Sequence, residues 1–151
     1  GEHASILGEL DGKGIKFPVL NGPVGHASGL KICYAAITKG TAALYASTLM
    51  TAKSLGLFED LIHELEGSQA STLAAMDGVN SISAKAFRWI GEMEEIAATF
   101  EDAGSTPMIH MGAAETFQRI ADSAIGHERV DSIDRSRTLE QTVEQLVKKP
   151  G

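Results

Sequence analysis

One lysine stands out among the residues that could do chemistry. Lys31 lies near the start of a long alanine-rich stretch, Asn21–Leu55, which we expect to be largely helical. A lysine in the first turn of a helix meets an electropositive helix N-terminus, so its place there is slightly unfavourable. At about 100° per residue, Ala35 and Thr38 share its face and Tyr34 flanks it. A lysine above such small neighbours can act as a general acid or hold an anion. The alternative is an ordinary surface lysine.

The other reactive side chains carry weaker signals. The five histidines, at positions 3, 26, 63, 110 and 127, have no partners at ligand spacing, so we expect no metal site. Cys33 has no histidine near it in the sequence, and we expect a small buried side chain rather than a nucleophile. The turn Gly22-Pro-Val-Gly25 lacks the full GxGxxG pattern of a phosphate-binding loop.

Helical periodicity defines the elements that must position these residues. Small residues on every side of the first helix indicate a central helix that its neighbours approach closely, which favours an all-α fold. Thr138 and Gln141 form a predicted capping box for the last helix. Apolar steps of three and four predict the remaining helices over 57–66, 83–103 and 108–125, with a short helical turn over 68–76.

The ends of these helices follow from their flanking residues. We expect Ser28 to cap the central helix, and Ser81 or Ser83 to cap the helix over 83–103. Gly67 should end the helix over 57–66. The charge-dense segment 126–137 should be a surface connection, and Ile15–Leu20 a short edge strand or extended arm. Trp89 is expected in the core, and Glu92, Glu94 and Glu95 on a solvated face.

Composition excludes several classes of function. The net charge of −7 argues against a nucleic-acid partner, which usually requires a basic surface. One cysteine cannot form an internal disulfide, which fits a reducing compartment. No apolar run approaches the roughly 20 residues that cross a bilayer, and residues 1–20 lack the layout of a secretory signal. We therefore expect a cytoplasmic protein without a membrane partner.

Two stretches resemble a known family. The run Gly22–Gly40, GPVGHASGLKICYAAITKG, resembles the opening of the C-terminal domain in the β-hydroxyacid dehydrogenase superfamily, which includes 6-phosphogluconate and 3-hydroxyisobutyrate dehydrogenases. The run Ala86–Phe100, AFRWIGEMEEIAATF, is similar to the Arg-Trp-x-Gly-Glu-Met-Glu-Glu-Ile signature of the branch that carries the domain of unknown function 1932. His110–Glu115 continues that signature.

The resemblance implies a fold and a set of partners. It implies a 6-phosphogluconate dehydrogenase C-terminal-domain-like helical bundle, all-α, around a long central helix. Residues 22–151 would be the substrate-binding and dimerisation domain of a homodimer, and residues 1–21 an extended arm that remains from the exit of a Rossmann domain. That Rossmann domain is missing from this sequence, so NAD or NADP would bind the full-length enzyme and not this chain alone.

The resemblance also implies site residues. Lys31 matches the proton-donating lysine of the family. The family commonly has Asn one turn later on the same face, where this chain has Ala35, so we expect Tyr34 or Thr38 to supply the missing hydrogen bond. The implied contacts to substrate come from Gly22, Gly25, Ser28, Tyr34 and Thr38.

Two functional hypotheses remain open at this point. The first is the substrate-binding, dimerising C-terminal half of an NAD(P)-dependent oxidoreductase acting on a hydroxy acid or its carbonyl partner. The second is a stand-alone helical dimer that binds a small molecule and has lost redox chemistry. A GxGxxG motif encoded upstream of Gly1 would favour the first.

Overall fold

The computed structural model describes residues 8–14, 16 and 20–148. Within these residues the secondary structure is helical and no β-strand occurs, which confirms the all-α fold. The chain divides into two compact units, Gly1–Tyr34 and Ala35–Gly151.

The first unit contains a short 3-10 helix, η1 (Gly8–Leu10), and the beginning of helix α2 (His26–Ser54). The backbone amide of Gly29 donates to the Gly25 carbonyl at 2.8 Å, so the first helical turn forms ahead of Ser28. The expected cap at Ser28 is therefore wrong, because this residue lies inside the helix. The expected strand Ile15–Leu20 falls mostly outside the described residues.

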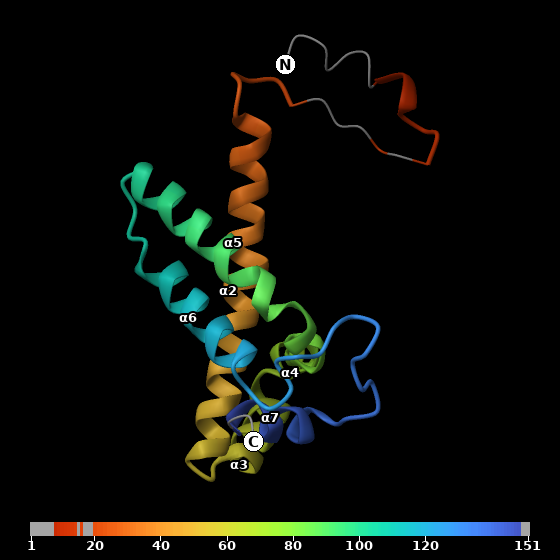
Figure 1. Ribbon diagram of the computed structural model, residues 1–151, viewed down its shortest axis with the longest axis vertical. Helices are drawn as coiled ribbons and strands as arrows, with labels where there is room; N and C mark the ends of the chain where they lie inside the picture. The colour runs from red at the N-terminus through yellow and green to blue at the C-terminus, as the bar shows by residue number, and fades with distance from the viewer. Residues whose placement is uncertain (1–7, 15, 17–19, 149–151) are drawn as a thin grey trace. The chain divides into compact units, whose positions relative to one another are not determined.

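The second unit is built on the part of α2 that follows Tyr34 (Figure 1). Alanine accounts for most of the buried positions of this helix, with Leu49 and Met50 as the large exceptions. Alanine leaves room for neighbouring backbones to come close, as the small-residue pattern predicts. The buried residues are Ala36, Ala43, Ala46, Leu49, Met50 and Ala52.

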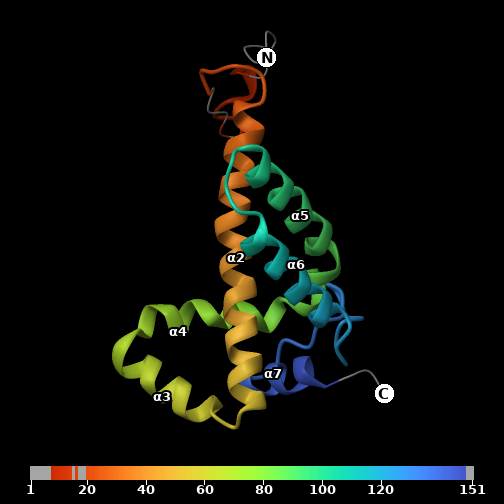
Figure 2. The ribbon, with the colours of Figure 1, turned by 90° about the vertical axis from the view of Figure 1, so that its left-hand side faces the viewer.

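Helices α3 (Phe58–Ser68) and α4 (Ala70–Met76) form a hairpin, visible in Figure 2, and the 3-10 helix η2 (Asp77–Ser81) follows. Helix α3 continues through Gly67 to Ser68, so it ends two residues beyond the predicted last residue, Glu66. Gly67 keeps helical geometry because the Gln69 amide still donates to the Leu65 carbonyl at 2.8 Å.

Helices α5 (Ser83–Asp102) and α6 (Met108–Ala121) pack side by side in both views (Figures 1 and 2). Their apolar stripes face each other, since Met93 and Phe117 are both fully buried. The Trp89 and Phe117 rings meet edge to face with their centroids 5.2 Å apart. Trp89 itself is half-buried, at the edge of the core. Helix α6 ends at Ala121, short of the predicted Ile125.

Helix α7 (Leu139–Val147) closes the second unit. The predicted capping box is confirmed, with Thr138 and Gln141 exchanging side-chain and backbone hydrogen bonds. Lys53, in the last turn of α2, donates to Glu140 at 2.6 Å and pairs with Glu144 at 2.9 Å, which ties α7 to α2. None of the described helices combines the length and the apolar character that crossing a membrane requires.

Candidate functional site

Lys31 lies in the second turn of α2, because the helix begins at His26. The expected first-turn position is therefore wrong, and the repulsion from the helix N-terminus is weaker than at a first-turn position. The Lys31 side chain is exposed and makes no hydrogen bond or ion pair with any residue that the structure describes. Its amine is accordingly available to a ligand.

The Gly22–Gly25 turn precedes this helix, and its backbone requires a glycine at position 25. Gly25 has φ of 100°, a left-handed conformation that favours glycine. A Cβ atom at Gly22 would overlap the imidazole of His26, so a larger residue would displace that ring. The turn therefore fixes how the chain enters α2, five residues before Lys31.

The remaining predicted site residues divide between the two units. Ser28 and Tyr34 belong to the first unit with Lys31, and both are exposed, Tyr34 to 68%. Thr38 belongs to the second unit, where its hydroxyl donates to the Ala35 carbonyl at 3.3 Å. Thr38 also lines a cavity of about 270 Å³ that reaches Trp89. The structure thus places Gly22, Gly25, Ser28, Lys31 and Tyr34 in one unit and Thr38 in the other.

Two expectations about other side chains are wrong, one of them only in part. Cys33 is exposed rather than buried, because it lies in a part of α2 where no residue is buried. Glu94 and Glu95 are exposed, as expected for a solvated face, but Glu92 is partly covered, since it pairs with Lys39 at 2.6 Å and with Arg88 at 3.4 Å. Lys39 is mostly covered, with 17% of its side chain exposed.

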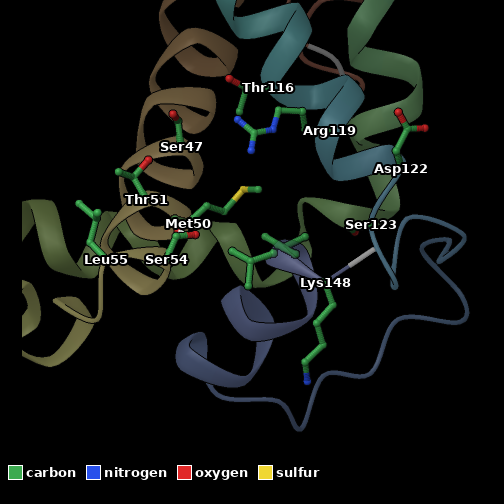
Figure 3. A pocket seen from close by; sticks show the side chains of 12 residues that line it. Ser47, Met50, Thr51, Ser54, Leu55, Thr116, Arg119, Asp122, Ser123 and Lys148 are labelled. Carbon is green, nitrogen blue, oxygen red and sulfur yellow. Dashed lines mark hydrogen bonds between the residues drawn. The ribbon is translucent and has the colours of Figure 1, made fainter. Parts of the chain in front are cut away.

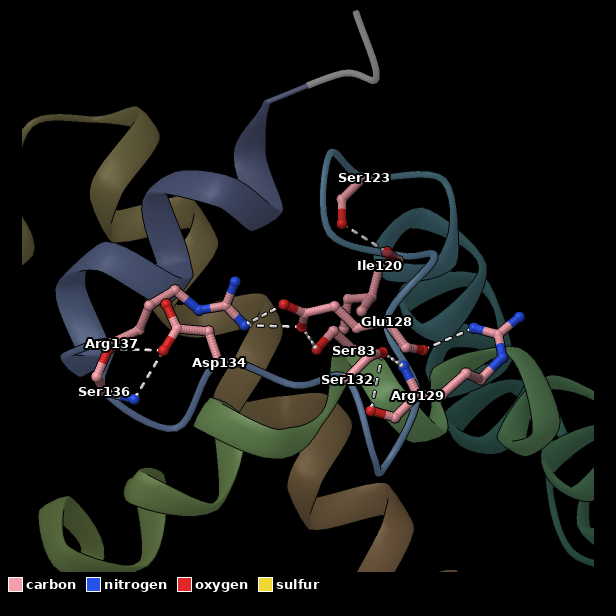
Figure 4. A network of polar contacts seen from close by, with 9 residues as sticks. All are labelled: Ser83, Ile120, Ser123, Glu128, Arg129, Ser132, Asp134, Ser136 and Arg137. Carbon is pink, nitrogen blue, oxygen red and sulfur yellow. Dashed lines mark hydrogen bonds and ion pairs between the residues drawn. The ribbon is translucent and has the colours of Figure 1, made fainter.

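The segment 126–137 contains a buried charge that no sequence pattern indicates (Figure 4). Glu128 is only 6% exposed. Its carboxylate accepts hydrogen bonds from Arg137 Nη2 at 2.6 and 2.7 Å and from the Ser83 hydroxyl at 2.6 Å. The predicted surface connection is thus held into the core at this residue, and Ser83 binds Glu128 instead of capping α5.

Burial alone would raise the pKa of Glu128, because it disfavours the charged form. The hydrogen bonds from Arg137 and Ser83 and the charge of Arg137 outweigh that effect and hold the pKa below its ordinary value. Glu128 is therefore an ionised, fully partnered group, which suits it to hold structure and not to exchange protons with a substrate.

A second ionisable group is buried without such partners. His110 in α6 is 6% exposed, and its ring meets Phe100 edge to face at 4.2 Å. Burial lowers the pKa of His110, so the ring stays neutral around pH 7. No group of three or more histidine, cysteine or acidic side chains gathers as a metal site within the described part of the chain.

A polar cavity of about 410 Å³ lies between α2, α6 and the end of α7 (Figure 3). The Arg119 guanidinium extends from α6 toward α2. The Asp122 carboxylate, which also lines the cavity, accepts from Gln118 Nε2 at 3.0 Å and leaves Arg119 without an ion-pair partner among the described residues. Arg119 and Lys148 both line the cavity, together with Ser47 and Thr51, so it presents cationic and hydroxyl groups to an anionic ligand.

An apolar groove of about 480 Å³ runs along α2 and α6. Ile37 and Leu44 on α2 and Ile109 on α6 line it while remaining 63–70% exposed. Gly40 and Gly112 also line the groove, and because they lack side chains they leave its floor open. We call this surface the α2–α6 groove.

Part of the chain matches the model of a known protein family. The model of a family described as Domain of unknown function (DUF1932) matches residues 52–120, and no curated protein matches the chain. That domain is known as a C-terminal part of hydroxyacid dehydrogenase-like proteins. The match includes the run Ala86–Phe100 and His110–Glu115, but it begins after Lys31 and the other predicted site residues.

Proposed function

We propose that this chain is the substrate-binding, dimerising C-terminal half of an NAD(P)-dependent oxidoreductase that acts on a hydroxy acid or its carbonyl partner. The observation that carries the proposal is the match over residues 52–120, which lies within the all-helical second unit. Such a domain supplies substrate contacts and a proton, while the dinucleotide is held elsewhere.

The residues of this chain do not fit a dinucleotide. The pyrophosphate of NAD or NADP is bound where a strand, a glycine-rich turn and a helix follow one another. No described strand precedes the Gly22–Gly25 turn, and the turn has only part of the glycine pattern. We therefore assign the cofactor to a separate Rossmann domain and derive no step through it.

Lys31 is the general acid in this proposal. Its exposed amine can hold the proton that the substrate oxygen gains on reduction or loses on oxidation. Gly22, Gly25, Ser28 and Tyr34 lie near it in the sequence, within the same unit, and supply the proposed substrate contacts.

The test replaces Lys31 by Ala in an enzyme that carries this chain after its Rossmann domain. We expect turnover to fall by roughly 10²–10⁴-fold, the usual contribution of a positioned general acid. Folding should be nearly unchanged, because Lys31 is exposed.

The control must be a lysine of equal exposure without partners. Lys39 is unsuitable because its loss would also break the ion pair with Glu92. Lys13 is exposed, and its side chain makes no bond to a described residue, so Lys13→Ala is the matched variant. An equal loss of turnover in both variants, or no loss in either, would show that Lys31 is not the general acid.

The α2–α6 groove supports the homodimer in this proposal. The apolar stripes of α5 and α6 do not provide that surface, since they are buried against each other. Ile37, Leu44 and Ile109 remain exposed beside two glycines, an arrangement that lets the helices of a second copy come close. The same surface would serve a stand-alone helical dimer, so it does not by itself favour redox chemistry.

A further inference from the structure

The α2–α6 groove contains one side chain that can change its charge near neutral pH. The described residues that line the groove are apolar residues, glycines, serine and threonines, except for His110. Among these described residues there is no carboxylate, lysine or arginine. Histidine is the side chain whose ordinary pKa lies nearest to neutral pH. A change of pH can therefore place a charge on a surface whose lining otherwise carries none.

The imidazole of His110 is poorly placed to carry that charge. The residue is 6% exposed, and its ring meets the Phe100 ring with the centroids 4.2 Å apart. Its Nδ1 atom is buried and has no hydrogen-bond partner among the described residues. Both nitrogens of an imidazolium carry a proton, so the Nδ1–H group of the charged form would lack an acceptor.

No charged neighbour compensates for this burial within the described part of the chain. Burial is the cause that lowers the pKa of His110 below its ordinary value. Tyr45, the nearest phenol on the second-unit part of α2, lines a different cavity beside Trp89. The charged residues within two positions of Phe100 or of the groove lining are Glu101 and Asp102 on α5, Glu115 on α6, and Lys39 on α2, which pairs with Glu92.

A second copy of the chain on this surface would cover what remains exposed of His110. In a two-fold symmetric dimer both copies use the same surface, so both His110 side chains would enter the interface. Covering the rings disfavours their charged form further, and two charged rings would repel each other. Protonation of His110 is therefore linked to separation of the two copies.

We propose that His110 makes the assembly of two copies through the α2–α6 groove dependent on pH, so that the dimer is weakened in mildly acidic solution. This inference rests on the homodimer of the proposed function. The pKa of His110 lies below 6.5 in the free chain, and the dimer would lower it further. The dissociation constant should thus be constant above the pKa of the free chain and rise as the pH falls through it.

The test measures the dissociation constant of the wild-type chain by sedimentation velocity at about pH 7.5 and about pH 5. We expect a rise of about tenfold or more at the acidic pH, because each dimer that separates frees two histidines to bind a proton. Far-ultraviolet circular dichroism should give the same helical signal at both pH values. That measurement distinguishes dissociation from unfolding.

His110→Phe removes the titrating group and keeps a ring against Phe100. Its dissociation constant should be the same at both pH values. The matched control is His63→Gln on α3, which removes a histidine with a 91% exposed side chain outside the groove and should keep the wild-type pH dependence. Should His110→Phe not fold, His110→Gln is equally unable to titrate and should lose the pH dependence in the same way.

The failure of this inference differs from the failure of the homodimer. A wild-type dimer with the same dissociation constant at both pH values would overturn the role of His110 and leave the homodimer in place. Wild-type pH dependence in a folded His110 variant would do the same, because another group would then be responsible. A wild-type chain that is a monomer at the higher pH would remove the homodimer and this inference with it.

Discussion

At the scale of single residues, the buried pair of Glu128 and Arg137 leads to the sharpest prediction about stability. Glu128→Gln leaves the largely covered Arg137 guanidinium, 13% exposed as a side chain, without its countercharge. Breaking one partner of a buried pair costs about 3–5 kcal/mol of unfolding free energy. Urea unfolding at pH 7 measures this loss.

The control is Glu115→Gln, at an exposed position of α6, which should change stability by no more than about 0.5 kcal/mol. Replacing both partners by apolar residues, as Glu128→Leu with Arg137→Met, should recover part of the loss. The double variant should lose less unfolding free energy than the two single variants lose together. A larger loss would show that the ion pair is not the reason for the destabilisation.

The same carboxylate gives the wild-type protein a pH dependence. Its folded pKa lies below the ordinary value of 4.5, so its contribution to stability is complete above pH 4.5. That contribution is lost as the pH falls from 4.5 through the folded pKa. The stability difference between wild type and Glu128→Gln should therefore shrink over that acidic window.

Residue types alone could not reveal this pair. Glu128 stands between His127 and Arg129 in a charge-dense run, and no periodic pattern distinguishes a buried carboxylate there from a solvated one. The burial depends on Ser83, which is 45 residues distant in the chain. Lys31 was easier to single out from the sequence, because its position near the start of a helix follows from the residue pattern alone.

At the scale of elements, periodicity located the helices well and their ends less well. The paired stripes of α5 and α6 are both long enough to show a clear period, and both helices form as predicted. The serine caps failed because α5 follows directly from the 3-10 helix η2, with Ile82 in helical geometry at the cap position. Only a three-dimensional neighbour, here Glu128, explains why Ser83 is polar.

A glycine just beyond α6 provides a test at this scale. A Cβ atom at Gly126 would overlap the backbone carbonyl of Ala121, which cannot move without unwinding the end of α6. We expect Gly126→Ala to destabilise the protein by about 1–3 kcal/mol, the usual range for overpacking. Thermal unfolding followed by circular dichroism measures the change.

The matched substitution is Gly91→Ala, inside α5 and facing open space. It should leave stability unchanged or raise it by up to about 1 kcal/mol, because alanine favours the helix. Similar losses of stability in Gly126→Ala and Gly91→Ala would show that the contact with the Ala121 carbonyl does not cause the destabilisation.

At the scale of the whole molecule, the α2–α6 groove predicts how the homodimer can be separated. Leu44→Glu places a charge on the surface that a second copy would cover, and desolvating that charge is unfavourable. We expect a monomer at low micromolar concentration by sedimentation velocity. The helical signal should persist, because Leu44 is 63% exposed within one chain.

Leu57→Glu is the comparison, at a 49% exposed position beside the start of α3 and away from the groove. It should remain dimeric. A wild-type protein that is itself a clean monomer, or a dimer that survives Leu44→Glu, would move the interface elsewhere or remove it. The family resemblance implied a homodimer, but the apolar periodicity of α5 and α6 could not show that their stripes face each other within one chain.

The attachment of α7 to α2 has a consequence during synthesis. Val143 and Leu146 are among the most buried side chains of the second unit, and Lys53 finds both its carboxylate partners on α7. A ribosome produces α2 to α6 before any of these groups exist, at about 5–20 residues per second. The nascent second unit therefore waits with an uncovered apolar face until its last helix emerges. A product truncated before Thr138 would keep that face exposed and be a substrate for quality-control proteases.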